Sequence, residues 1–225
     1  MIFCSGNRNY EKSFHSFAPA MEMKERIQLK AEELFKRFGI RSVTMDEISN
    51  QLGISKKTLY QSYTDKEEIV SAVFDGIIGE NKQRCVVDRQ MAENAVHEVF
   101  LAFDNVLQMF AEINPAILFD LQKYHPNVYS KFNDYKYHFL YDVISDNLRR
   151  GIEEGLYRTE LNVDIMTRYR IESSMLAFNT DIFPQSKKDL VGVERELMEH
   201  FLFGIATTRG TKLINKYIQQ RLKQL

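Results

Sequence analysis

Apolar side chains recur at helical spacing from residue 23 onward. Ile27, Ala31, Leu34 and Phe38 lie three or four residues apart, which places them on one face of a helix. Gly39 follows directly, at the position where glycine commonly ends a helix. No segment shows the alternation of apolar and polar residues that is typical of strands. The pattern therefore predicts an all-α protein.

Three further helix starts follow in the next 25 residues. Thr44, with Glu47 three positions later, matches the capping box that opens a helix, and Gly53 ends that helix. Ser55 and Asp65 are expected to cap the next two helices. The apolar positions expected to face inward in these three helices are Ile48 and Leu52, then Leu59, then Ile69, Val73, Ile77 and Ile78.

The rest of the chain also predicts helices, over residues 92–113, 127–154, 162–179 and 188–208. The breaks between them are expected at Asn114-Pro115, His125-Pro126, Gly155, Pro184 and Gly210. Residues 1–20 lack a sustained apolar period and are expected to form a flexible leader. Met21 and Met23 are alternative translation starts to Met1.

The second and third helices, joined by a tight glycine turn, predict a helix-turn-helix. Such a motif needs a small residue where its helices cross, and Ser49 supplies it. Between Ser49 and Thr64 there is no acidic residue. Thr44 and Lys66 stand at helix starts, where free backbone N–H groups favour a phosphate. The donors that can reach phosphates or base edges are Ser55, Lys56, Lys57, Thr58, Tyr60 and Tyr63.

This segment, TMDEISNQLGISKKTLYQSYTDKEEI over residues 44–69, resembles the DNA-binding domain of TetR-family transcriptional regulators. The resemblance covers roughly residues 23–74. It departs from the usual alanine at 49, histidine at 62 and phenylalanine at 63, where this chain has Ser49, Ser62 and Tyr63. It implies that Thr44, Tyr60 and Lys66 hold the DNA backbone, while residues 55–58 face the major groove.

The resemblance also implies two domains. We expect a leader at 1–20, a three-helix DNA-binding domain with the helix-turn-helix at 21–66, and a larger C-terminal helical domain for ligand binding and dimerisation at 67–225. The charge distribution agrees, although the 30 basic and 31 acidic residues nearly cancel. Residues 1–66 hold 11 basic and 8 acidic side chains, a net of +3, whereas the remainder holds 19 and 23. Contact with nucleic acid is thus expected to be local.

Several other classes of protein lack support in the sequence. Cys4 and Cys85 are too few for a disulfide scaffold. Neither a secretory signal nor a run of about 20 apolar residues is present, so we expect a cytoplasmic protein without a membrane partner. The five histidines are not at metal-ligand spacing, and no phosphate-binding glycine loop or catalytic triad context occurs. We therefore expect no enzyme activity, metal or cofactor.

The last long helices predict a homodimer. Over residues 188–208 one stripe holds Leu190, Val193, Leu197, Phe201 and Ile205, and an adjacent stripe holds Val191, Met198 and Leu202. A helix with two apolar stripes is expected to bury one against a partner. Residues 162–179 combine Ile165, Tyr169 and Leu176 with Ser173, Ser174 and Ala177. Four such helices from two chains would join two reading helices over a palindromic operator on double-stranded DNA.

The aromatic middle helices predict a cavity for a small apolar or amphipathic effector. Its expected lining residues are Phe103, Asn105, Phe110, Phe119, His138 and Tyr141, because ligand pockets combine apolar walls with few polar anchors. The function predicted is a ligand-responsive, sequence-specific transcriptional regulator, a repressor released by a small molecule. The alternative is a constitutive DNA-binding structural or partner-recruiting protein of the same fold. A core filled by the aromatics would favour this alternative, and a void with polar anchors would favour ligand control.

Overall fold

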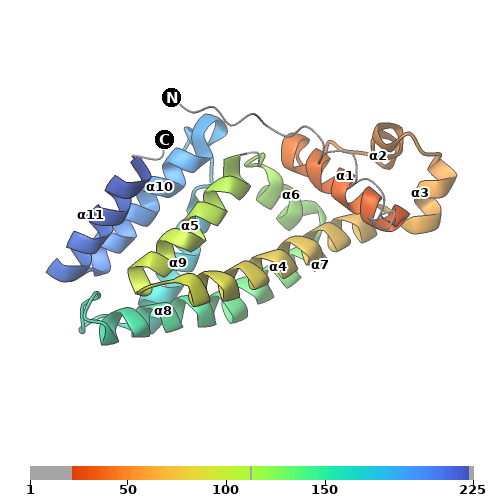
Figure 1. Ribbon diagram of the computed structural model, residues 1–225. Helices are drawn as coiled ribbons and strands as arrows, with labels where there is room; N and C mark the ends of the chain where they lie inside the picture. Colours follow the sequence, from red (N-terminus) through yellow and green to blue (C-terminus); the bar gives the residue numbers. More distant parts are fainter. Residues whose placement is uncertain (1–21, 112, 223–225) are drawn as a thin grey trace, which may run out of the picture.

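The computed structural model describes residues 22–111 and 113–222, in which helices follow one another from end to end (Figure 1). The leader expected at 1–20 lies outside these residues. The helices are α1 Met23–Phe38, α2 Met45–Leu52, α3 Lys56–Ser62, α4 Lys66–Met91, α5 Ala95–Ala111, α6 Ile117–Tyr124, α7 Pro126–Asp134, the π-helix η1 Tyr135–Leu140, α8 Tyr141–Glu153, α9 Val163–Leu176, α10 Ser186–Ile205 and α11 Thr208–Leu222. The predicted all-α fold is confirmed.

The predicted caps of the N-terminal helices are present. The Thr44 hydroxyl accepts the Glu47 N–H at 3.1 Å, the Ser55 hydroxyl accepts the Thr58 N–H at 3.1 Å, and Asp65 Oδ1 accepts the Glu68 N–H at 2.9 Å. These bonds satisfy N–H groups that have no partner inside the helix. Local chemistry therefore sets the starts of α2, α3 and α4.

The first core cluster joins α1–α3 to the rest of the molecule. The buried side chains of α1–α3 pack with Ile69, Val70, Val73 and Phe74 of α4, and also with residues of α6 and α7. The packing of the first three helices thus continues past residue 67, where the sequence-based division into domains falls. Figure 1 shows α1–α3 gathered at one end of the molecule, with α4 running from them along the helical body.

The second core cluster lies within the C-terminal helices. It is built mainly from α5, α8, α10 and α11, with Tyr157 fully buried at its centre. Within the described ranges the only strand-like pairing is an antiparallel bridge between Tyr157 and Ala206. None of the helices in these ranges has the length and apolar character needed to span a bilayer.

The predicted break at Gly210 is wrong, because Gly210 lies inside α11. The chain turns at Ala206 and Thr207 instead, where the Thr207 hydroxyl accepts the Gly210 N–H at 3.1 Å and donates to the Gly155 carbonyl at 2.9 Å. A Cβ at position 210 would lie 2.1 Å from the Leu156 carbonyl oxygen. Glycine is therefore needed there for close packing and not for a turn.

Two other long segments are less regular than the pattern predicts. The run at 127–154 is divided by η1, whose wider turn shifts the faces of the residues around it. In α10, Asp189 has non-helical backbone angles, and its Oδ1 accepts the Gly192 N–H at 2.7 Å. Regular helix therefore begins after Asp189, close to the predicted start at 188.

Candidate DNA-binding surface and ligand cavity

The turn between α2 and α3 has the geometry of a helix-turn-helix. Gly53 adopts a left-handed conformation, at φ 65° and ψ 29°, which favours glycine. The Ile54 N–H donates to the Ser49 carbonyl at 3.1 Å. Ser49 is buried, as expected for the small residue between the helices, and Ile48 and Leu59 are buried beside it.

The polar side chains of α3 form the exposed surface of this motif. Ser55, Lys56, Lys57 and Tyr60 are exposed, whereas Thr58 is half-buried with its hydroxyl 2.8 Å from that of Ser55. Figure 1 shows α3 at the outer edge of the molecule. The surface is therefore open to a partner as large as a DNA duplex.

The fold brings an acidic residue to this surface that the spacing along α3 does not reveal. Asp46, at the start of α2, forms an exposed ion pair with Lys56 at 2.6 Å. Lys57 has no ion-pair partner among residues 22–111 and 113–222. Gln61 is exposed one helical turn after Lys57 and was missed by the sequence reasoning, although its i+4 spacing is a signal for a shared face. Lys57 and Gln61 therefore lie on the same exposed face of α3.

For Tyr63 two roles are expected from the sequence, contact with DNA and, with more weight, aromatic packing in the core, and its buried side chain takes the core position. Tyr63 is 1% exposed, and its hydroxyl donates to the Lys24 carbonyl at 3.3 Å. Burial, with a smaller effect from Glu68, raises the pKa of this phenol. The Lys24 ammonium lies 4.8 Å from the ring centroid. Tyr63 therefore joins α1 to the end of α3.

Thr44 and Lys66 lie on either side of the motif and differ in their exposure to solvent. Thr44 is exposed at the start of α2. Lys66 is half-buried, and its ammonium donates to the Ile40 carbonyl at 2.6 Å and to the Arg41 carbonyl at 3.4 Å. Burial lowers its pKa, opposed by Asp120. Lys66 therefore holds α4 to the turn between α1 and α2, and a phosphate would have to share its donors.

A cavity of about 260 Å³ lies within the helical body, with walls from α4–α10 and η1. Of the six predicted ligand-binding residues, Phe103, Asn105 and Phe110 line it. The Asn105 side-chain amide donates to Asp88 Oδ2 at 2.9 Å, which holds both polar groups in the wall. The cavity therefore combines an apolar lining with fixed polar groups, as ligand sites commonly do.

The other three predicted residues do not line this cavity. Phe119 is 58% exposed and borders a second, open hollow of about 920 Å³ beside α6 and α9. His138 is exposed, and the Tyr141 hydroxyl donates outward to Asp164 at 2.7 Å. Around His138 and Tyr141 the chain forms the π-helix, and there Tyr135 and Leu140 line the cavity instead.

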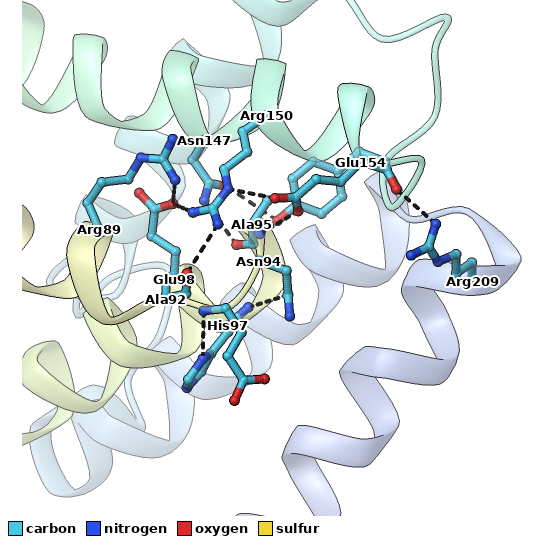
Figure 2. Close-up of polar contacts among 12 residues, drawn as sticks. Arg89, Ala92, Asn94, Ala95, His97, Glu98, Asn147, Arg150, Glu154 and Arg209 are labelled. Atoms are coloured by element: carbon cyan, nitrogen blue, oxygen red, sulfur yellow. Dashed lines mark hydrogen bonds and ion pairs between the residues drawn. The ribbon is translucent and has the colours of Figure 1, made fainter.

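A polar cluster joins α4, α5 and α8 (Figure 2), and its members Glu98 and Asn147 also line the cavity. Glu98 accepts hydrogen bonds from Arg150 at 3.1 Å and from Arg89 at 3.4 Å, and Arg150 also donates to Glu154 at 2.6 Å. Burial, reinforced by neighbouring carboxylates, raises the pKa of Glu98 to about 7. The cluster therefore fastens α5 to α8 through the largely buried contact between Glu98 and Arg150.

The helix α6 connects the body to the DNA-binding end. The Arg41 N–H donates to Asp120 Oδ2 at 2.8 Å, and the Asn114 N–H, just before α6, donates to the Lys36 carbonyl at 2.6 Å. Ile117 of the same helix lines the cavity and belongs to the first core cluster. One short helix therefore touches both the cavity and the helices that carry the motif.

The apolar surface expected to form the dimer is only partly available in one chain. Members of both stripes of α10 are buried within the chain, including Leu190 and Phe201 of the first and Met198 and Leu202 of the second. The expectation that one whole apolar stripe of α10 is left for a partner is therefore wrong. Ser173 and Ala177 of α9 also face inward, whereas Ile165, Tyr169 and Leu176 are exposed along one face of α9. Val193 and Leu197 remain half-exposed in line with Gly204.

An exposed helix-turn-helix with basic side chains, joined by shared helices to a body with a cavity, defines a helical DNA-binding regulator of transcription. No group of three His, Cys, Asp or Glu in the described part of the chain is placed to hold a metal. Residues 29–73 match the family of bacterial regulatory proteins named after TetR. Over this segment the chain matches the DNA-binding domain of TetR-family regulators, and the residues after 73 lie outside the match.

Similar proteins agree in class and in fold. The HTH-type transcriptional regulator YvaF of Bacillus subtilis is 34% identical over 46% of this chain, a match that spans 54% of the length of YvaF. The regulator FadR of Bacillus subtilis, solved with stearoyl-CoA, superposes with a TM-score of 0.64 at 20% identity, over 80% of this chain and 98% of FadR. A regulator of Saccharomonospora viridis, solved with choline, gives 0.66 at 16% identity, over 82% and 97%.

Proposed function

We propose that the protein is a homodimeric, ligand-responsive repressor, which leaves a palindromic operator when a small molecule occupies its cavity. The observation that carries this proposal is the dual placement of α4 and α6. Phe74 of α4 and Ile117 of α6 belong both to the core of the DNA-binding end and to the cavity wall. A ligand that displaces either helix would therefore move α2 and α3.

The coupling requires that the ligand bind two states with different affinities. The hydrogen bond between Asp120 and the Arg41 N–H links α6 directly to the turn before α2. Lys66 links α4 to the same turn, because its ammonium donates to the Ile40 carbonyl. A shift of these helices would change the separation of the two reading helices in a dimer, which must match major grooves about 34 Å or more apart.

The constitutive alternative has less support. Its distinguishing expectation is a core filled by the aromatic residues, whereas a cavity of about 260 Å³ with buried polar groups in its wall favours ligand control. Two of the structural relatives were solved with small molecules, stearoyl-CoA and choline. These two molecules differ in chemistry, so they do not identify the effector of this chain.

The DNA-binding part of the proposal can be tested in two steps. The protein first selects fragments from genomic DNA, and its binding to the recovered site is then titrated. Lys57→Ala is expected to weaken binding about tenfold and to lower the salt slope by about one, because it removes one phosphate or base contact. Lys56→Ala is expected to have a smaller effect, since Asp46 already holds Lys56. Lys212→Ala, an exposed lysine of α11, is the matched control.

Two results would contradict the proposal at different points. Recovery of fragments with no common sequence would exclude a site-specific regulator. Unchanged operator binding when the cavity is saturated with a ligand would leave the constitutive alternative in place.

A further inference from the structure

The cavity wall contains one buried ion pair that the packing of the chain does not fully satisfy. Arg170 of α9 donates from Nη2 to Glu194 Oε1 of α10 at 3.0 Å. Both side chains line the cavity, and they are 14% and 0% exposed. The Arg170 guanidinium carbon lies 5.8 Å from the centroid of Phe201, another lining residue.

One buried polar atom on each side chain of this pair has no hydrogen-bond partner in the described residues. Arg170 Nη1, a donor, and Glu194 Oε2, an acceptor, are both buried, and neither has a hydrogen-bond partner among residues 22–111 and 113–222. A buried polar atom without a partner destabilises a fold, and an apolar pair of similar volume would be at least as stable here. A role in stability alone therefore does not explain why the pair is placed in the wall.

We propose that Arg170 and Glu194 are the polar anchor of the effector site, and that they bind a neutral head group which accepts one hydrogen bond and donates another. A primary amide on an apolar chain has this chemistry. Its carbonyl would accept from Arg170 Nη1 and its N–H would donate to Glu194 Oε2. The inference rests on the proposed function only for the regulatory meaning of the site.

The charges of the cavity favour a neutral ligand over an anion. The pair is neutral as a unit, and the other charged lining residues, Lys36 and Arg84 against Asp88 and Glu98, also balance. A carboxylate would bring a negative charge beside Glu194 and would have to share Arg170, which Glu194 already pairs with, and this is costly in a poorly solvated site. An acceptor without a donor, such as a nitrile, would leave Glu194 Oε2 unpaired.

The volume limits the length of the apolar chain. A protein cavity of about 150 Å³ holds benzene, so about 260 Å³ accommodates roughly ten non-hydrogen atoms. Octanamide has about that size, and octanenitrile and octanoate are close matches that differ in the head group alone. Comparison of the three compounds separates the effects of a hydrogen-bond donor, a hydrogen-bond acceptor and a negative charge in the head group.

Isothermal titration calorimetry of the full chain with the three compounds tests the anchor. Octanamide is expected to bind about tenfold or more tightly than either octanenitrile or octanoate, as a hydrogen bond to a charged group commonly gives. In Glu194→Gln the negative charge is gone, so the preference for octanamide over octanoate is expected to fall to about threefold or less. Glu196→Gln, on the exposed face of α10, should keep the preference of the wild type.

A second variant guards against effects on folding. In Arg170→Met/Glu194→Met the pair is replaced by apolar side chains, a change that buried ion pairs often tolerate, and octanamide should lose its advantage over octanenitrile. The inference is wrong if octanoate binds the wild type as tightly as octanamide. It is also wrong if the folded wild type binds none of the three, or if both variants keep the wild-type ratios.

The anchor and the proposed function fail separately. A chain that binds a specific DNA site but not octanamide overturns the anchor and leaves the regulator standing. A chain that binds octanamide with the expected ratios, but recovers no common DNA sequence, overturns the regulator and leaves the anchor standing.

Discussion

At the scale of single residues, burial divides side chains of the same type into different roles. Tyr60 and Tyr63 lie three positions apart, yet Tyr60 is 49% exposed and Tyr63 is 1% exposed. The sequence places both in the basic, acid-free segment, and composition alone does not show which ring faces the core. The departure from phenylalanine at 63 therefore adds a hydroxyl to a core position, where it bonds to the Lys24 carbonyl.

Tyr63→Phe is expected to destabilise the fold by about 1 kcal/mol, the usual net value of one hydrogen bond. It should leave operator affinity within about twofold of the wild type, because the ring stays in the core. Urea denaturation and fluorescence anisotropy with labelled operator measure the two effects. Tyr60→Phe is the matched control, with the opposite expectation of weaker binding and unchanged stability. A loss of affinity in Tyr63→Phe larger than in Tyr60→Phe would return Tyr63 to the DNA-binding set.

Glu98 gives the stability a dependence on pH. Burial raises its pKa from the ordinary 4.5 to about 7, so the folded chain holds this proton more tightly than the unfolded chain does. The contribution of this group to stability is therefore fully present below about pH 4.5 and is lost as the pH rises through about 7. Between pH 5 and 8 we expect the unfolding free energy of the wild type to fall, relative to Glu98→Gln, by about 2 kcal/mol.

Urea denaturation at several pH values measures this difference, and subtraction of the Glu98→Gln curve removes the titration of other groups. Glu196→Gln, an exposed site of the same residue type, should follow the wild type. A difference that grows with rising pH would mean that the arginine contacts, and not burial, set the pKa of Glu98.

At the scale of elements, the sequence predicts helices best where side chains cap them. Thr44, Ser55 and Asp65 mark helix starts through bonds to their own neighbours, so local chemistry was enough to predict where α2, α3 and α4 begin. Gly210 was mistaken for a break because the contact that requires it, with the Leu156 carbonyl, comes from a residue 54 positions earlier. The π-helix at 135–140 likewise has no local signal that the apolar spacing could reveal.

Gly210→Ala is expected to destabilise the chain by about 2–3 kcal/mol, because its Cβ would lie 2.1 Å from a backbone oxygen that cannot move freely. Gly79→Ala in α4 is the control, since nothing lies within 4 Å of a Cβ there. Alanine is the better helix former, so this control should gain up to about 1 kcal/mol. Thermal and urea unfolding of both variants check the pair. Equal behaviour of the two would show that α11 can shift away from Leu156.

At the scale of the whole molecule, the predicted site depends on how distant helices meet. The DNA-binding surface was largely predictable, because its residues lie in one short segment with a recognisable pattern. The cavity was predicted only for Phe103, Asn105 and Phe110, which share α5. Arg170 and Glu194 were missed, since they lie 24 positions apart on two helices and only the fold brings them together. Asp46 was missed beside Lys56 for the same reason.

The exposed apolar face of α9 is the surface through which we expect two chains to associate. Ile165 is 57% exposed and lies in line with Tyr169 and Leu176, a row of large apolar side chains that a single chain leaves in water. Burial of this face against a second copy would remove it from solvent and would place two reading helices on one DNA duplex. Ile165→Glu introduces a charge at the most exposed member of that row and is expected to give the mass of one chain by light scattering at micromolar concentration.

Operator affinity should fall with the loss of the dimer, by about a hundredfold or more, because two linked half-sites bind with a high effective concentration and one alone does not. Val86→Glu, at an exposed valine of α4, adds the same charge elsewhere and should change neither mass nor affinity. A wild-type mass equal to one chain would contradict the dimer directly. If Ile165→Glu kept both the double mass and full affinity, the chains would associate through another face, and the half-exposed row of Val193, Leu197 and Gly204 on α10 would be the next to test.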